Sequence, residues 1–101
     1  MSSTQSNADY FCDQLSALGE IKAKKMFGEY GVYANGLYFA LICDNKLFFK
    51  VKKWKVADVL EIFGNQSEPY PGAKGCCQVP FEMIEDKDRL TEIAKLVIDK
   101  L

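Results

Sequence analysis

The sequence contains no histidine and a single arginine, and both shortages limit what the protein can do. Histidine is the usual general base near neutral pH and the commonest protein ligand of transition metals. Arginine is preferred for reading bases and for gripping phosphates with two parallel hydrogen bonds. A catalytic site is therefore hard to build from this chain, and sequence-specific DNA recognition by Arg89 alone is not expected. We therefore expect that the protein is not an enzyme and that it has neither a metal centre nor a cofactor site.

Long apolar runs are also missing. The longest, residues 37–43, is far shorter than the roughly 20 residues that cross a bilayer, and the polar start of the chain lacks the features of an export signal. The sequence therefore predicts a cytoplasmic protein with reduced thiols. Its four cysteines are Cys12, Cys43, Cys76 and Cys77. None has a candidate base nearby in the sequence, so we expect buried, unreactive thiols.

The middle of the chain has the pattern of an antiparallel meander. Aromatic and β-branched residues dominate residues 30–34, 37–43 and 46–52, and the pairs Asn35-Gly36 and Asp44-Asn45 separate these runs. Asn-Gly favours a type I′ turn, because both central residues need positive φ, and Asp-Asn tolerates the same geometry. The sequence therefore predicts hairpins at both breaks.

Two further strands are expected around this meander. One covers residues 22–27, with Gly28 and Gly31 allowing a bulge or sharp bend where the chain enters the meander. The other covers residues 76–83, where Pro80 restricts the strand to an edge or an end, since proline cannot donate a ladder hydrogen bond.

Three segments have apolar residues at helical spacing. They cover residues 7–18, 54–63 and 86–101. Asn7 and Asp86 are expected N-caps, and Gly19 and Gly64 are typical of the position that follows a helix. Trp54 is expected to anchor the second helix in the core.

These elements predict a two-layer α+β domain in the order α-β-β-β-β-α-β-α, with amphipathic helices against one antiparallel sheet. Residues 1–6 are expected to be a flexible tail and residues 7–101 a single domain. The Pro- and Gly-rich loop over residues 65–75 is a candidate functional surface. We expect Tyr70 and Phe81 to contact a protein partner there.

Positive charge is concentrated in one part of the chain. Residues 20–55 hold eight lysines and three acidic residues, although the whole chain has a net charge of -1. Strand alternation gathers one candidate nucleic-acid face from the residues Lys22, Lys24, Lys46, Phe48, Lys50 and Lys52. Lysines with an interleaved aromatic are typical of surfaces that track single strands. The alternative, which we favour from the sequence, is that the lysines solvate an open sheet face and protect its edges.

Residues 26–51, MFGEYGVYANGLYFALICDNKLFFKV, resemble the N-terminal domain of the TfoX/Sxy family of competence regulators. The segment Ser67-Glu68-Pro69-Tyr70, a glycine-containing spacer, Val79-Pro80 and a final helix extend the resemblance over nearly the whole chain from Ile21. The family usually has a second glycine where this sequence has Glu29.

The resemblance implies a small bacterial α+β domain, similar in topology to type III secretion chaperones and not known as an enzyme. It further implies regulation of DNA-uptake genes together with the cyclic-AMP receptor protein, through protein contacts more than autonomous DNA reading. Full-length members carry a second domain, whereas this chain ends at Leu101, so we expect a stand-alone form, monomeric or homodimeric. The expected function is a non-enzymatic module that modulates transcription by protein contact. The alternative is weak direct nucleic-acid binding through the lysine-lined face.

Overall fold

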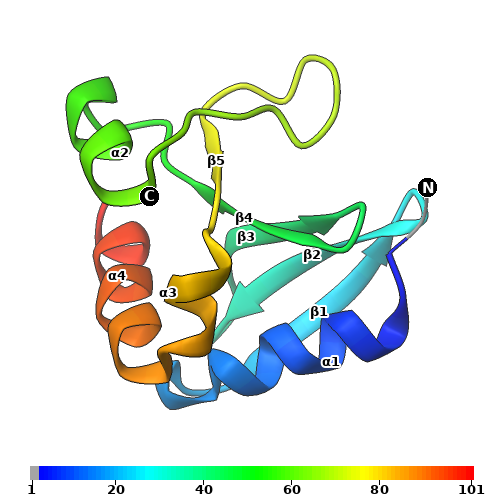
Figure 1. Ribbon diagram of the computed structural model, residues 1–101. Coiled ribbons are helices and arrows are strands. Elements are labelled where there is room, and N and C mark those ends of the chain that lie inside the picture. The colour runs from blue at the N-terminus through cyan, green and yellow to red at the C-terminus, as the bar shows by residue number, and fades with distance from the viewer. Residues whose placement is uncertain (1–2) are drawn as a thin grey trace.

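The computed structural model describes residues 3–101 and shows a five-stranded antiparallel sheet with helices packed against it (Figure 1). The strands are β1 (Ile21–Met26), β2 (Glu29–Ala34), β3 (Leu37–Cys43), β4 (Lys46–Lys50) and β5 (Cys76–Gln78), side by side in chain order. The helices are α1 (Gln5–Gln14), the 3-10 turn η1 (Ser16–Leu18), α2 (Val56–Phe63), α3 (Phe81–Glu85) and α4 (Lys87–Asp99). The predicted α+β architecture and its element order are confirmed.

Two-residue turns connect the first four strands. Asn35-Gly36 has φ of 50° and 87°, and Asp44-Asn45 has φ of 52° and 59°, as the sequence predicts for both hairpins. A third turn, Phe27-Gly28, has φ of 52° and 81° and joins β1 to β2. The bend expected near Gly28 is therefore a tight turn, and the irregularity in the pairing of β2 with β3 lies between Val32 and Tyr33 instead.

The first helix begins earlier than its pattern suggests. Thr4 is the N-cap, and its hydroxyl accepts a hydrogen bond from the Asn7 amide, so the expectation that Asn7 caps the helix is wrong. Of the expected tail, residues 1 and 2 lie outside the described residues. The Ser3 and Thr4 amides donate hydrogen bonds to Glu29 and Asn45, so the ordered chain starts before residue 7.

The last strand is shorter than expected, and the short helix α3 takes the place of its second half. β5 ends at Gln78, because Pro80 adopts the extended N-cap conformation of α3. Asp86 then caps α4 as predicted, its carboxylate accepting a hydrogen bond from the Arg89 amide. The expected strand over residues 79–83 is wrong for this reason, since proline suits a helix start and not a paired strand.

The main core fills the space between the sheet and the helices. Phe49 of β4 is central to it, with the rings of Phe39 and Phe63 each 5.9 Å away. Trp54 packs against Phe63 at the same distance and is buried, as predicted, although α2 begins only at Val56. All the longer helices contribute buried residues to this core, so they cover one face of the sheet. No helix within residues 3–101 is long and apolar enough to cross a membrane.

Candidate functional site

The sheet face turned away from the helices, called here the open face, carries a second and smaller apolar cluster. Its buried members are Leu41, Cys43, Phe48 and Cys76, with Tyr38 packed against them. Leu41 pairs with Phe48 across β3 and β4, and Lys50 pairs with Cys76 across β4 and β5. No helix contributes to this cluster, so the open face is the surface with room for a ligand.

A row of four side chains crosses the open face, and we call it the lysine–tyrosine row. The rings of Tyr33 and Tyr38 stack with centroids 5.1 Å apart and an interplanar angle of 25°. The Lys24 ammonium lies 4.9 Å from the Tyr33 ring centroid, and the Lys50 ammonium lies 4.1 Å from that of Tyr38. Each of the strands β1 to β4 thus supplies one member of the row, and a lysine ammonium lies over each of the two tyrosine rings.

Gly31 makes room for this row. A Cβ atom at this position would lie 3.1 Å from the Met26 methyl and 3.2 Å from the Tyr38 ring, which is closer than side chains normally pack. Burial raises the pKa of the Tyr38 phenol to about 12, with smaller contributions from neighbouring groups that include Tyr70 and Tyr33. The Tyr38 hydroxyl therefore stays protonated at neutral pH and can donate a hydrogen bond.

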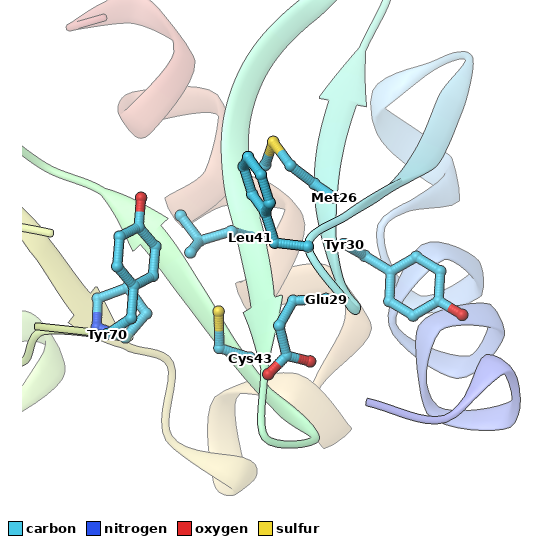
Figure 2. A pocket seen from close by; sticks show the side chains of 8 residues that line it. Met26, Glu29, Tyr30, Leu41, Cys43 and Tyr70 are labelled. Carbon is cyan, nitrogen blue, oxygen red and sulfur yellow. The ribbon is translucent and has the colours of Figure 1, made fainter. Parts of the chain in front are cut away.

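A hollow of about 320 Å³, called here the apolar groove, adjoins the row. It is lined by Met26, Phe27, Glu29, Tyr30, Leu41, Cys43, Pro69 and Tyr70. Figure 2 shows Tyr70 facing Leu41 and Cys43, while the Tyr30 ring is directed away from Tyr70. The loop over residues 65–75 and the β1–β2 turn therefore contribute to the same groove.

Phe27 is the most exposed aromatic residue described, at 102%, and it occupies the β1–β2 turn with φ of 52°. A bulky side chain at positive φ is unfavourable for the backbone, and its exposure yields no burial to offset that cost. Such a combination points to a contact residue, because strained positions cluster at functional surfaces. The sequence pattern puts Phe27 at the end of the strand over residues 22–27, and its one local signal is the aromatic side chain directly before Gly28.

Glu29 closes the groove at the end near the β3–β4 turn. Its carboxylate accepts hydrogen bonds from the backbone amides of Ser3, at 2.7 Å, and Asp44, at 2.9 Å. Partial burial raises the pKa of this carboxyl, but the hydrogen bonds from Ser3 and Asp44 outweigh it and hold the pKa below its ordinary value of 4.5. The charge of Glu29 therefore ties the start of the chain to the sheet.

The lowered pKa of Glu29 predicts a pH-dependent stability. A carboxyl whose pKa is lower in the folded state stabilises the fold above its unfolded pKa, about 4.5, and this stabilisation is lost as the pH falls through the folded pKa. Glu29→Gln should lower the thermal midpoint at pH 7 and flatten its decline between about pH 5 and pH 3. Thermal melts at several pH values measure this, with the exposed Glu92→Gln as control. Parallel declines in wild type and Glu29→Gln would contradict it.

The structure places the six residues of the candidate nucleic-acid face in four situations. Lys22, Lys24 and Lys50 share the open face, but β2 and β3 separate β1 from β4, so the lysines do not form one continuous strip. Phe48 is only 5% exposed and cannot serve as a contact. Lys46 lies beside the β3–β4 turn, paired with Cys43. Lys52 lines a hollow of about 200 Å³ with Tyr38 and Lys50.

Tyr70 and Phe81 do not form one surface. Tyr70 is 56% exposed and lines the apolar groove on the open face. Phe81 is 62% exposed and begins α3, a helix whose Met83 and Ile84 pack into the main core. The two aromatics therefore lie in different surroundings, and their contact with a protein partner stays a prediction.

The thiols have no environment that activates them. Burial raises the pKa of Cys43 to about 11, with smaller contributions from Glu29, Cys76 and Asp44, and it raises the pKa of Cys77 to about 12. Burial also raises the pKa of Cys12 and Cys76. Thiols with raised pKa are poor nucleophiles at neutral pH. Within residues 3–101, no three potential ligand side chains gather into a metal site.

Comparison with known proteins identifies the family. The model of the TfoX N-terminal domain matches residues 13–101. The chain is also 28% identical over 98 residues to a Spirochaeta aurantia protein described as an uncharacterized 12.7 kDa protein in the trpE 5′ region, an alignment covering 95% of this chain and 81% of the relative. The family match covers all five strands and the helices α2, α3 and α4, but only the end of α1. The chain therefore belongs to the TfoX N-terminal domain family.

Proposed function

We propose that this chain is a non-enzymatic regulatory module that modulates transcription by contact with a protein partner. Membership of the TfoX N-terminal domain family is consistent with a regulatory, competence-related role. The observation that carries the proposal is the apolar groove, where Phe27 and Tyr70 are exposed beside a hollow of about 320 Å³. The partner belongs to the transcription machinery, and the resemblance suggests the cyclic-AMP receptor protein.

The groove has the composition of a contact surface. Single exposed apolar residues are common, but a contiguous group beside a hollow marks an interaction site. Aromatic residues and methionine are enriched where proteins contact one another, and the groove brings together Met26, Phe27 and Tyr70. Removing such anchors typically costs the most binding energy.

The chemistry of the chain favours binding over catalysis. The sequence has no histidine, and the raised pKa values of Cys43 and Cys77 keep these thiols protonated. The pKa of Glu29 is lowered, because its carboxylate accepts hydrogen bonds from backbone amides. A general base needs a pKa near the working pH. The pKa values of Glu29, Cys43 and Cys77 are shifted away from neutral pH.

A double substitution in the groove tests the proposal. Tagged wild-type protein should capture a protein partner from a nuclease-treated lysate of the source organism, and the Phe27→Ser/Tyr70→Ser variant should lose most of it. Phe81→Ser is the matched control, because it removes an equally exposed aromatic from the helical layer. Capture is quantified by mass spectrometry. The free energy of unfolding should change by no more than about 0.5 kcal/mol for these surface substitutions.

The result can contradict the proposal in two ways. If Phe27→Ser/Tyr70→Ser captures the same proteins as wild type, the groove is not the contact surface. If every captured protein disappears on nuclease treatment, the contacts depend on nucleic acid, and the protein-docking function is wrong.

Weak nucleic-acid binding is the second candidate function, and the shared face of Lys22, Lys24 and Lys50 favours it. Proteins that hold single strands stack bases on free aromatic faces. Here Tyr33 and Tyr38 stack on each other, and Lys24 and Lys50 cover the outer sides of the pair. A base could stack only after displacing a lysine, so we rank this candidate second.

A further inference from the structure

Lys24 and Lys50 give the open face positive charge that no ion pair neutralises among the described residues. Within residues 3–101 there is one ion pair, in which the Lys22 ammonium lies 3.8 Å from the Glu20 carboxylate, and both side chains are largely exposed. Lys24 and Lys50 contact tyrosine rings and no carboxylate. This charge lies on the same face as the apolar groove.

More lysines gather where the row ends at β4. The hollow of about 200 Å³ beside Tyr38, called here the lysine hollow, is lined by Tyr38, Lys50, Lys52, Lys53, Lys100 and Leu101. No acidic side chain lines it. Lys53 donates a hydrogen bond to the Leu101 carbonyl oxygen, and the Lys100 ammonium lies 4.8 Å from the Trp54 ring centroid. Lys50 and Lys52 remain available to an anionic group.

The apolar groove and the lysine hollow lie a short distance apart along β3. Leu41 and Cys43 line the first and Tyr38 lines the second. Leu41 and Tyr38 pair with Gly31 and Tyr33, which are two positions apart on β2, or about 7 Å at the usual rise of a strand. An extended peptide advances at the same rate per residue. Side chains two positions apart on an extended peptide point to the same side, so an apolar side chain in the groove and an acidic one two positions away would reach both sites.

The charges also fix the direction of such a peptide. Glu29 lies at the groove end nearest the β3–β4 turn, and its lowered pKa keeps it negative at neutral pH. An acidic residue at that end would be repelled by Glu29, whereas one at the other end would meet Lys50. Acidic residues therefore belong on the Tyr38 side of the apolar anchor.

We propose that the open face binds an extended acidic segment of a partner protein, with one apolar side chain in the apolar groove and carboxylates contacting Lys24, Lys50 and Lys52. The groove volume, about 320 Å³, is at the lower limit for ligand sites and suits an anchoring side chain. Nucleic acid fits this face less well, because Tyr33 and Tyr38 stack on each other and lysines lie over both rings, so that a base would have to displace a lysine to stack. This inference rests on the proposed protein-docking function and specifies its ligand.

A peptide titration tests the inference with the full chain. The probe is a fluorescent peptide of about twelve residues with one phenylalanine and with aspartates beginning two positions later. Two control peptides replace the aspartates by asparagine or the phenylalanine by serine, and labelled oligothymidine of similar length is the nucleic-acid probe. Anisotropy should show binding of the acidic peptide, weakened at least about tenfold with either control peptide.

Protein variants locate the binding site. Lys24→Gln/Lys50→Gln and Phe27→Ser/Tyr70→Ser should each weaken binding of the acidic peptide at least about tenfold. Lys87→Gln/Lys95→Gln removes the same charge from exposed positions of α4 and should change the affinity less than about twofold. Circular dichroism and thermal melts confirm that each variant is folded.

The outcomes separate this inference from the function on which it rests. Equal binding to wild type and Lys24→Gln/Lys50→Gln, or no binding at about 1 mM peptide, overturns the inference. So does salt-sensitive binding of oligothymidine without binding of the peptide. If the peptide fails while Phe27→Ser/Tyr70→Ser still loses its captured protein, the docking function stands and the assigned ligand chemistry is wrong.

Discussion

Replacing Phe49 by alanine is expected to lower the free energy of unfolding by about 3–5 kcal/mol, the usual cost of deleting a buried aromatic side chain. Phe49 is 0% exposed and lies between the rings of Phe39 and Phe63. Sheet and helices both contact it, so neither layer can close over the cavity without losing contacts elsewhere.

Urea denaturation followed by circular dichroism measures the Phe49→Ala effect. Domains of this size are typically stable by about 5–15 kcal/mol, so the variant should unfold at a much lower urea concentration with a similar slope. Phe81→Ala is the control, because its exposed ring should be worth no more than about 0.5 kcal/mol. Equal losses for Phe49→Ala and Phe81→Ala would show that Phe49 is not central to the core.

Replacing Asn65 by alanine is expected to cost about 2–4 kcal/mol, a large effect for a loop residue. The Asn65 amide nitrogen donates hydrogen bonds to the carbonyl oxygens of Phe63 and Gln78. Its side-chain oxygen accepts hydrogen bonds from the Gln78 amide and the Ser67 hydroxyl. Asn65 thus occupies the outer edge of β5 as a neighbouring strand would, and alanine would leave several polar groups without partners.

The Asn65→Ala variant is tested by denaturation together with amide hydrogen exchange. The Gln78 amide should exchange much faster in the variant, since it loses its acceptor. Gln66→Ala changes the next, exposed residue and should affect neither stability nor exchange. Unchanged protection at Gln78 in Asn65→Ala would mean that the side chain does not hold β5.

Local signals made much of the fold predictable. Asn35-Gly36 and Asp44-Asn45 specify hairpins through their tolerance of positive φ, and Gly64 ends α2 in the left-handed conformation with φ of 75°. Phe27-Gly28 was harder to assign, because phenylalanine disfavours the φ of 52° that it adopts. The start of α1 was missed since Thr4 and Asn7 are both good caps and only tertiary contacts select between them.

The candidate site was predictable only in its charges. Strand alternation correctly put Lys22, Lys24 and Lys50 on the face opposite the core. The stacking of Tyr33 on Tyr38 depends on the register shift between Val32 and Tyr33, which no local pattern encodes. The burial of Phe48 depends likewise on the distant Cys76 of β5, a partner set by tertiary folding.

The strands lie side by side in the order in which they occur along the chain. This topology predicts the order in which they pair during folding. Each pairing from β1 to β4 closes over a two-residue turn, so it costs little loop entropy and can form early. The pairing of Phe48 with Gln78 joins distant segments and must wait for α2 and the following loop. We expect the hydrogen bonds of Asn65 to form after the rate-limiting barrier, so their loss should accelerate unfolding and leave refolding nearly unchanged in stopped-flow kinetics. We therefore expect the meander to set the folding rate. The hydrogen bonds between Asn65 and β5 should set the unfolding rate, and with it the lifetime of the native state.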